Sequence, residues 1–191
     1  DILLAGQKSG VVHALNPDDG ELLWRTRVSP GSALGGIHWG LAVSGRSVIV
    51  PINDPLNVPG RKPGVYSLDI DTGKIRWSHL AEAPCAEPFA SGAPWADCPY
   101  GFSAAASTTG DVAFAASLAG VMYAFDASSG KILWQYDTAR GFDAVNGLPA
   151  SGGSIDNPGI QIAGDMVFVG SGYSLFGELP GNALLAFKLG K

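Results

Sequence analysis

The stretch that decides the fold is GVYSLDIDTGKIRW, residues 64–77, because it occurs in three copies along the chain. The other two copies are VVHALNPDDGELLW, residues 11–24, and VMYAFDASSGKILW, residues 121–134. Each copy ends in tryptophan, with glycine four residues before it and Asn or Asp eight residues before it. Self-similarity at a fixed spacing indicates a repeat architecture in which each copy is one structural unit.

Each copy predicts a β-hairpin with a defined register. The Asn or Asp side chain can accept a hydrogen bond from the backbone two residues on, which starts a turn. The glycine takes the positive-φ position that closes the hairpin. A tryptophan at a fixed place is a large apolar block that can dock between neighbouring sheets. The turn-starting residues are Asn16, Asp69 and Asp126, the glycines are Gly20, Gly73 and Gly130, and the tryptophans are Trp24, Trp77 and Trp134.

A further pair of short strands precedes the hairpin in the later copies. These pairs are WGLAVS with RSVIVPI, FSAAAST with DVAFAAS, and PGIQIA with DMVFVGS, joined by the polar turns SGR, TGD and AGD. Four antiparallel strands in each repeat of about 45–60 residues are typical of a β-propeller blade. A β-sandwich is the alternative all-β architecture, but it predicts no such periodicity.

We therefore expect an all-β chain that forms one partial β-propeller domain, residues 1–191, with about three to four four-stranded blades. The approximate blade boundaries are 1–30, 31–82, 99–140 and 152–191. The first copy begins at its second strand and the last ends at its third, which gives two complete and two partial blades. Propellers have typically about 4–8 blades, so we expect either a piece of a larger ring or a half that pairs with another chain.

Composition excludes several classes of function. The net charge of −5 and the pI near 5.0 argue against a nucleic-acid partner, which requires a basic surface. No apolar run approaches the roughly 18 residues of a membrane span. The three histidines, His13, His38 and His79, lack metal-ligand spacing, so no metal site is predicted.

The two cysteines, Cys85 and Cys98, lie in one Pro/Ala-rich loop. A disulfide between them would close a short loop and fit an oxidising compartment. The alternative is two unpaired thiols. No CxxCH is present in the sequence, so this segment attaches no c-type haem.

The repeat motif, read as A-x-D-x-x-x-G-x-x-x-W, resembles that of the quinoprotein alcohol dehydrogenases, which hold pyrroloquinoline quinone (PQQ) in an eight-bladed propeller. AGQKSGVVHAL, residues 5–15, and GGIHWG, residues 35–40, are similar to two stretches of that family that lie at the cofactor. TARGFDAVNG, GSIDNPGIQIAGDMVFVGSGYS and GELPGNALLAFKLG resemble the polyvinyl alcohol dehydrogenase branch. Non-catalytic propellers, including outer-membrane assembly factors, share the general motif.

The resemblance implies cofactor-binding roles for four residues. Lys8 matches a cation that polarises a quinone carbonyl, where it would stabilise developing negative charge; the alternative is a lysine in water at the blade edge. His38 stands where the family has asparagine, and Trp39 matches the family tryptophan. The alternative for both is packing at the start of the innermost strand. Phe102 stands where many relatives have a tryptophan in the channel.

The resemblance also implies what this chain does not contain. The calcium ligands and the catalytic aspartate of the family lie upstream of the stretch around Lys8, so both are expected outside the chain and the catalytic residue is unknown. Asp97 is a candidate acid at the substrate mouth, with ordering of its loop as the alternative. Asn53 and Asp54 mimic a calcium-site segment in the wrong blade, and the favoured interpretation is a turn before Pro55.

The function implied is that of the C-terminal part of a periplasmic or secreted PQQ-dependent alcohol dehydrogenase. It would oxidise small or polymeric alcohols, pass electrons to cytochrome c and require the remaining half of the propeller. The alternative is a non-catalytic propeller that binds proteins or assists envelope assembly. Convergence of Lys8, His38 and Trp39 on an open polar channel favours the enzyme, whereas a Trp39 buried between blades and an outward Lys8 favour the scaffold.

Overall fold

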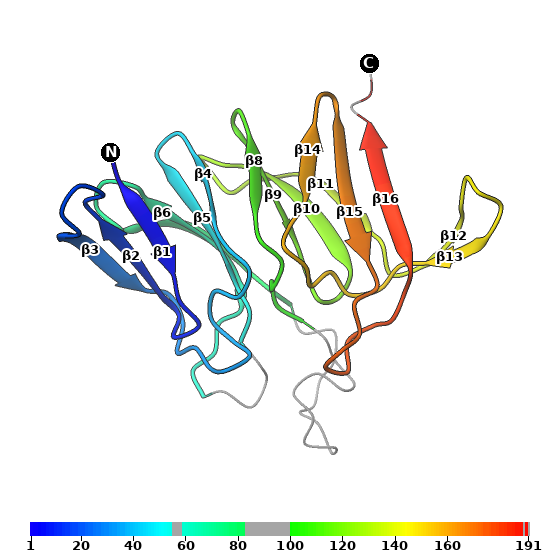
Figure 1. Ribbon diagram of the computed structural model, residues 1–191, viewed down its shortest axis with the longest axis horizontal. Coiled ribbons are helices and arrows are strands. Elements are labelled where there is room, and N and C mark those ends of the chain that lie inside the picture. The colour runs from blue at the N-terminus through cyan, green and yellow to red at the C-terminus, as the bar shows by residue number, and fades with distance from the viewer. Residues whose placement is uncertain (55–58, 83–99, 189, 191) are drawn as a thin grey trace.

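The structure is a computed structural model, and it describes residues 1–54, 59–82, 100–188 and 190. Within those ranges the secondary structure is entirely β, arranged as four antiparallel sheets in an arc and one separate hairpin (Figure 1). The first strand, β1, and the last, β16, lie on opposite sides of the view, so the described sheets do not close into a ring. The prediction of an all-β partial propeller is confirmed.

Two sheets have four strands and two have three, and in each the strands pair in chain order. The first consists of β1 (Leu3–Gly6), β2 (Val11–Leu15) and β3 (Leu22–Arg27). The second consists of β4 (Ala42–Ser44), β5 (Ser47–Ile52), β6 (Gly64–Asp69) and β7 (Ile75–Leu80). The third consists of β8 (Ser107–Thr109), β9 (Val112–Ala116), β10 (Val121–Asp126) and β11 (Ile132–Asp137). The fourth consists of β14 (Gln161–Ala163), β15 (Met166–Ser171) and β16 (Ala183–Lys188).

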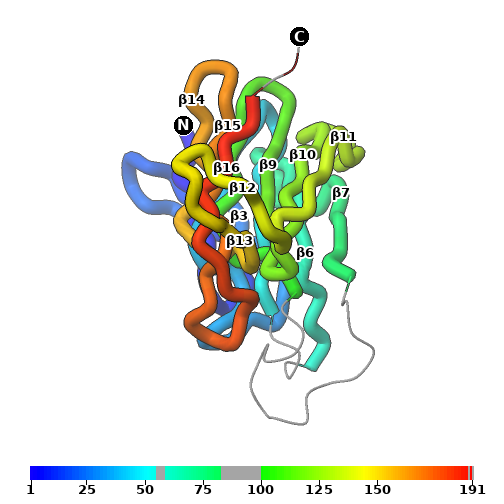
Figure 2. Tube along the Cα trace, turned by 90° about the vertical axis from the view of Figure 1, so that its right-hand side faces the viewer, coloured from blue at the N-terminus to red at the C-terminus, as the bar shows by residue number. Residues whose placement is uncertain are grey.

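A two-stranded hairpin, β12 (Gly141–Asp143) and β13 (Pro149–Ser151), is inserted between the third and fourth sheets in the chain. It projects beyond β16 in Figure 1, and in the view of Figure 2 it overlaps the neighbouring strands. Its base is fixed because the Ser151 amide donates to the Asn182 side chain (2.9 Å) and the Asn182 amide donates to the Ser151 carbonyl (2.7 Å).

The hairpin motif has the predicted turn in every copy. The amides of Asp18, Asp71 and Ser128 donate to the side chains of Asn16, Asp69 and Asp126 at 3.0, 3.2 and 3.1 Å. The three glycines have φ values of 77°, 67° and 75°. A bulge on the second strand of each hairpin pair shifts the register just before the turn, between Ala14/Leu15, Ser67/Leu68 and Ala124/Phe125.

The tryptophans join successive sheets, as the sequence predicts. Trp24 donates its indole N–H to the Ile70 carbonyl of the second sheet at 2.8 Å. Trp77 makes the equivalent bond to Ala127 of the third sheet at 3.0 Å. Each ring therefore lies against the turn of the next copy, and the repeat spacing is a consequence of contact between blades.

The hydrophobic core is divided into three clusters, each between two neighbouring sheets. The first includes Val12, Ile37, Val48, Val50 and Leu68, the second Ile49, Val65, Phe102, Ala113 and Phe125, and the third Ala104, Met122, Ile155, Ile160 and Val169. Each blade thus depends on its neighbours for burial, as repeat architectures require. The described residues include no helix of the length and apolar character that crossing a membrane requires.

Candidate functional site

The three connections that lead into β4, β8 and β14 are held by the same backbone hydrogen bond. In each, the amide of a buried apolar residue donates to a carbonyl at the end of a strand in the preceding sheet. The pairs are Ile37 with Gln7 (3.2 Å), Phe102 with Ile52 (3.0 Å) and Ile155 with Ser117 (3.3 Å). The side chains that come next, those of His38, Ser103 and Asp156, therefore hold equivalent places in three successive blades.

These three equivalent side chains form one hydrogen-bonded chain across the blades. His38 Nδ1 lies 2.7 Å from Ser103 Oγ, and Ser103 Oγ lies 2.6 Å from Asp156 Oδ1. The Trp39 indole N–H also donates to Asp156 Oδ1. Ser103 and Asp156 are almost fully buried, while His38 is partly exposed and Trp39 is 44% exposed. The cluster thus has a buried acidic end and a solvent-facing end made of an imidazole and an indole.

The donor and the acceptor of each hydrogen bond in this cluster can be assigned. Asp156 Oδ1 accepts from Trp39, and an ionised carboxylate is an acceptor only. Ser103 has a single O–H, so it donates to Asp156 and its oxygen accepts from His38. Neutral His38 therefore carries its proton on Nδ1, and Nε2 is left as a bare acceptor. No hydrogen-bond partner faces Nε2 within the described residues.

The electrostatic surroundings favour the neutral form of His38. Partial burial lowers the pKa of His38, the Asp156 carboxylate raises it, and the Lys8 ammonium lowers it. Burial is the largest of these effects, so the pKa lies below its ordinary value. At neutral pH the ring is consequently an uncharged base beside a carboxylate that can stabilise its protonated form.

A second carboxyl group, Glu178, lies behind Asp156 in the connection between β15 and β16. Glu178 is 4% exposed, and neither of its oxygens has a hydrogen-bond partner in the described part of the chain. Burial raises the pKa of Glu178 to about 8, and the neighbouring Asp156 carboxylate contributes to the increase. The protonated form of Glu178 is therefore favoured at neutral pH.

Lys8 reaches the same end of the sheets from the connection between β1 and β2. Its ammonium donates to the Ala33 carbonyl at 2.8 Å and is otherwise open to solvent. It is close enough to His38 to lower the pKa of that ring. The Lys8 charge thus acts on His38, which packs against Trp39, and Trp39 is not buried between blades. Convergence of the three residues on an open polar channel stays a prediction.

Asn53 and Asp54 hold the GGIHWG segment in place. Asp54 Oδ1 accepts from the Gly36 amide (3.1 Å) and the Ser29 hydroxyl (3.2 Å), and the Asn53 amide group donates to the Leu34 carbonyl (3.0 Å). Gly36 has φ of +66°, and a β-carbon there would lie 2.3 Å from the Lys8 carbonyl oxygen. These contacts show that Asn53 and Asp54 order the GGIHWG segment, whereas the predicted turn before Pro55 extends outside the described residues.

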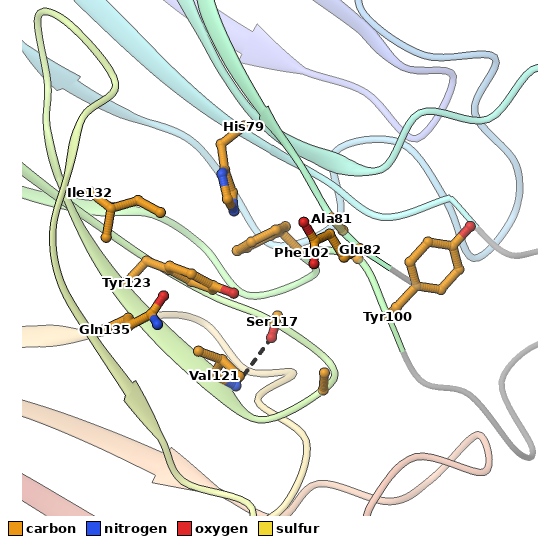
Figure 3. Close-up of a pocket in the computed structure, with 12 residues that line it drawn as sticks. His79, Ala81, Glu82, Tyr100, Phe102, Ser117, Val121, Tyr123, Ile132 and Gln135 are labelled. Atoms are coloured by element: carbon orange, nitrogen blue, oxygen red, sulfur yellow. Dashed lines mark hydrogen bonds between the residues drawn. The ribbon is translucent and has the colours of Figure 1, made fainter. Parts of the chain in front are cut away.

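Phe102 faces away from this cluster. It is 1% exposed and belongs to the core between the second and third sheets. It also lines a cavity of about 410 Å³, where Figure 3 shows it facing His79 and Tyr123. Partial burial lowers the pKa of His79, with the Glu82 charge acting in the opposite direction. A contact between Phe102 and a cofactor stays a prediction, and the structure gives Phe102 a packing role.

Three sequence-predicted residues lie outside the described ranges: Asp97, Cys85 and Cys98. Their proposed roles as an acid and as a disulfide stay predictions. Among residues 1–54, 59–82, 100–188 and 190, no group of three or more His, Cys, Asp or Glu side chains could hold a metal ion. We therefore assign no calcium ligand among the described residues.

Sequence reasoning missed Ser103, Asp156 and Glu178. The first two could have been found by aligning the three stretches that enter the innermost strands, GGIHWG, YGFSAA and SGGSIDN, on their buried apolar residues. Glu178 has no such signal because it lies in the connection between β15 and β16, outside these aligned stretches. Its position next to Asp156 is visible only in the folded chain.

Comparison with known families places the chain in a class. A family model described as outer membrane protein assembly factor BamB matches residues 8–94 and 93–187. The two matches together span most of the sequence, and the chain belongs to this family of PQQ-type β-propellers.

Two curated relatives are similar to the chain in sequence, and one solved structure is similar in fold. Polyvinylalcohol dehydrogenase from Pseudomonas sp is 42% identical over 98% of the chain and 30% of its own length. Polyvinylalcohol dehydrogenase from Sphingopyxis sp. (strain 113P3) is 39% identical over 99% of the chain and 30% of its own length. The chain thus spans about a third of the length of these curated relatives. The quinohemoprotein alcohol dehydrogenase ADHIIG from Pseudomonas putida HK5 matches in fold, with a TM-score of 0.60 and 17% identity over 98% of the chain and 32% of that structure.

Proposed function

We propose that this chain is a segment of a PQQ-dependent alcohol dehydrogenase of the polyvinyl alcohol dehydrogenase type. The observation that carries the proposal is the cluster in which His38 and Trp39 are both linked to the buried Asp156, with the Lys8 charge acting on His38. Relatives named polyvinylalcohol dehydrogenase, at 39% and 42% identity, support it. Under this proposal the protein is periplasmic or secreted and passes electrons to a cytochrome c.

The residues present fit one edge of a planar quinone that carries carboxylates. The Lys8 ammonium supplies a positive charge that faces solvent, and Trp39 exposes nearly half of its surface as an aromatic wall. When bound, PQQ accepts a hydride from the alcohol. Lys8 would hold a carbonyl or carboxylate oxygen of the cofactor, and Trp39 would limit the access of water to it. Calcium ligands are expected in the part of the protein outside this chain.

The residues of this chain also organise the hydroxyl end of the substrate. The Asp54 contacts fix the backbone of Gly36, and with it the position of the His38 ring two residues later. The neutral ring offers a hydrogen-bond acceptor, which suits an alcohol O–H. We propose both small alcohols and a polymer as substrate classes.

The proposal is tested on the full-length protein that contains this chain, loaded with PQQ and Ca²⁺. Dye-linked oxidation of polyvinyl alcohol or of a short secondary alcohol is the expected result. The Lys8→Ala variant should weaken PQQ binding, measured by equilibrium dialysis, because it removes the cation. Absence of both oxidation and PQQ binding in the wild-type protein would overturn the proposal.

The second candidate function is a non-catalytic scaffold in envelope assembly. It is favoured by the family model, whose description is that of an assembly factor. It predicts that PQQ does not bind and that Lys8→Ala has no effect on any cofactor titration. The exposure of Trp39 and the proximity of Lys8 to His38 favour the enzyme instead.

A further inference from the structure

The connection between β15 and β16, residues 172–182, exposes several large apolar side chains. The exposed fractions range from 36% to 69% in four of its residues: Tyr173, Leu175, Phe176 and Leu179. We propose that this connection, called the apolar loop below, binds the carbon backbone of a polymeric alcohol and makes a polymer the preferred substrate. This inference deepens the proposed function and rests on it.

The apolar loop is held in place by backbone contacts at its neck. The Gly181 amide donates to the Gly172 carbonyl at 3.0 Å, and a β-carbon on Gly172 would lie 2.2 Å from the Gly181 carbonyl carbon. The Leu179 amide donates to Ser154 Oγ at 2.9 Å, and the Ser154 amide donates to the Leu179 carbonyl at 2.9 Å. Compact surface loops with adjacent ends are frequently functional. The exposed side chains are therefore presented from a loop that is tied down at both ends.

The apolar loop is connected to the His38 cluster through one buried acid. Within residues 173–180, Glu178 is the one buried residue, and the neighbouring Asp156 carboxylate contributes to the rise of its pKa. Asp156 also accepts the indole N–H of the partly exposed Trp39. Figures 1 and 2 both show the connection between β15 and β16 at the lower end of the sheets. The loop and the indole of the candidate cofactor wall thus share Asp156 as their support.

The chemistry of the apolar loop suits an uncharged ligand that carries hydroxyl groups. Glu178 is the only Asp, Glu, His, Lys or Arg in residues 172–182, and its protonated form is favoured at neutral pH. Neighbouring exposed apolar side chains are typical of a binding surface. Tyr173 and Ser174 are exposed as well, and their hydroxyl groups can exchange hydrogen bonds with a ligand. A chain that alternates methylene carbons with secondary hydroxyls offers both kinds of contact.

The apolar loop would favour a polymer over a small alcohol because only the polymer extends past the reacting carbon. Contacts to parts of a substrate that do not react, if made equally in the ground state and the transition state, lower KM and leave kcat unchanged. A short alcohol at the reacting position has no further atoms for the loop. The loop therefore acts on the choice between substrates and takes no part in hydride transfer.

The kinetic experiment compares polyvinyl alcohol with a short secondary alcohol on the full-length protein loaded with PQQ and Ca²⁺. The double variant Leu175→Asn/Phe176→Asn removes apolar surface from the loop and leaves the buried Glu178 in place. The KM for polyvinyl alcohol should rise about tenfold, as for the loss of a binding hot spot. The kcat for the polymer, and both constants for the short alcohol, should stay within about twofold of wild type.

The matched control is the double variant Val145→Asn/Leu148→Asn. It removes two exposed apolar side chains from the connection between β12 and β13, in the hairpin that precedes the fourth sheet. This variant should change the KM of neither alcohol. Both double variants should keep the thermal midpoint of wild type, because exposed positions contribute little to stability.

Binding of the polymer is measured without catalysis by electrophoresis of the full-length protein through native gels that contain polyvinyl alcohol. The wild-type protein and the Val145/Leu148 variant should be retarded, and the Leu175/Phe176 variant should be retarded much less. Dextran carries hydroxyl groups without a hydrocarbon backbone, so dextran gels should retard none of the three proteins.

The outcomes separate the apolar loop from the proposed function. If the wild-type protein oxidises the short alcohol and the Leu175/Phe176 variant keeps the wild-type KM for the polymer, the role of the loop is overturned and the proposed function stands. Loss of a concentration-dependent dimer in this variant, with unchanged retardation by the polymer, also overturns it, since the occupant is then a second copy. If the wild-type protein oxidises neither alcohol, the proposed function fails, and retardation alone decides whether the loop binds the polymer.

Discussion

Trp24 and Gly73 belong to successive sheets, and a β-carbon on Gly73 would lie 2.5 Å from Cε3 of the Trp24 ring. The same relationship joins Trp77 and Gly130, where the closest ring atom, Cδ2, would lie at 2.6 Å. Real β-carbon contacts are longer than this, so only glycine allows the indole to reach the carbonyl that it bonds. Gly73 and Gly130 therefore serve both their own turns and the neighbouring blade.

Replacing Gly73 should lower the free energy of unfolding by more than its positive φ angle alone predicts. Gly73→Ala combines strain at positive φ with overlap against Trp24, whereas Gly20→Ala has the strain alone, since nothing lies within 4 Å of its β-carbon. We expect Gly20→Ala to cost about 1–2 kcal/mol and Gly73→Ala at least about 1 kcal/mol more. Urea denaturation of both variants measures the difference, and equal losses would contradict the packing role.

The Asp126 side chain should stabilise its turn in a pH-dependent way. Hydrogen bonds from Ser128 and Ser129 lower the pKa of Asp126 to about 2, well below its unfolded value of 3.8. The ionised form is thus favoured by folding, so its contribution is present above pH 4 and lost as the pH falls through about 2. Asp126→Ala should lower the thermal midpoint at pH 6, and that deficit should shrink on acidification.

Asp126→Asn is the matched control for that experiment. Asn16 accepts the same turn hydrogen bond in the first copy, so an amide oxygen is sufficient there. The Asn variant should retain the turn but lose the dependence on pH below 4. A midpoint as low as that of the Ala variant at pH 6 would show that the carboxylate charge, and not the acceptor, matters.

Glu178 should make the protein less stable at alkaline pH. Its pKa is raised from 4.5 to about 8 in the folded chain, so the folded state binds the extra proton between these values. Its stabilising effect is fully present below pH 4.5 and is lost as the pH rises through about 8. Glu178→Gln removes this titration. As the pH rises from 5 to 9, the urea midpoint of the variant should therefore increase relative to that of the wild-type protein. Parallel curves would show that Glu178 titrates normally.

Asp54 should be essential to the segment that carries His38. It is fully buried and accepts from the Gly36 amide and the Ser29 hydroxyl. Asp54→Ala leaves both donors without this partner, which we expect to cost about 1–3 kcal/mol. The exposed Asp71→Ala, which removes only a surface pair with Arg46, is the control and should leave the urea midpoint nearly unchanged.

The repeat framework could be predicted from sequence because it is local. The spacing from Asp69 to Gly73 to Trp77 encodes a turn, and the turn encodes the register of both strands. The location of the indole in the next blade follows the same spacing, since Trp24 and Trp77 both donate to the carbonyl one residue after the turn-starting Asp of the next copy. The sequence was accordingly sufficient to predict the hairpins, the order of the blades and the docking of the tryptophans.

The candidate site was only partly predictable, for a geometric reason. Similarity in residue type pointed to Phe102, whereas the side chain that reaches His38 is that of the next residue, Ser103. Adjacent residues in extended chain point to opposite sides, so one step in sequence separates a core position from a site position. The identity of a serine or an aspartate at that step carries no recognisable motif, and its partners lie 53 and 65 residues away.

The equivalence of His38, Ser103 and Asp156 also bears on how such a site can arise. A duplicated blade inherits its Asp, Gly and Trp under mutual constraint, because each must fit the copy beside it. The residue after the buried apolar position is under no such constraint within its own copy. Different residues at that one position, in three tandem copies, place an imidazole, a hydroxyl and a carboxylate in hydrogen-bonded order across successive blades.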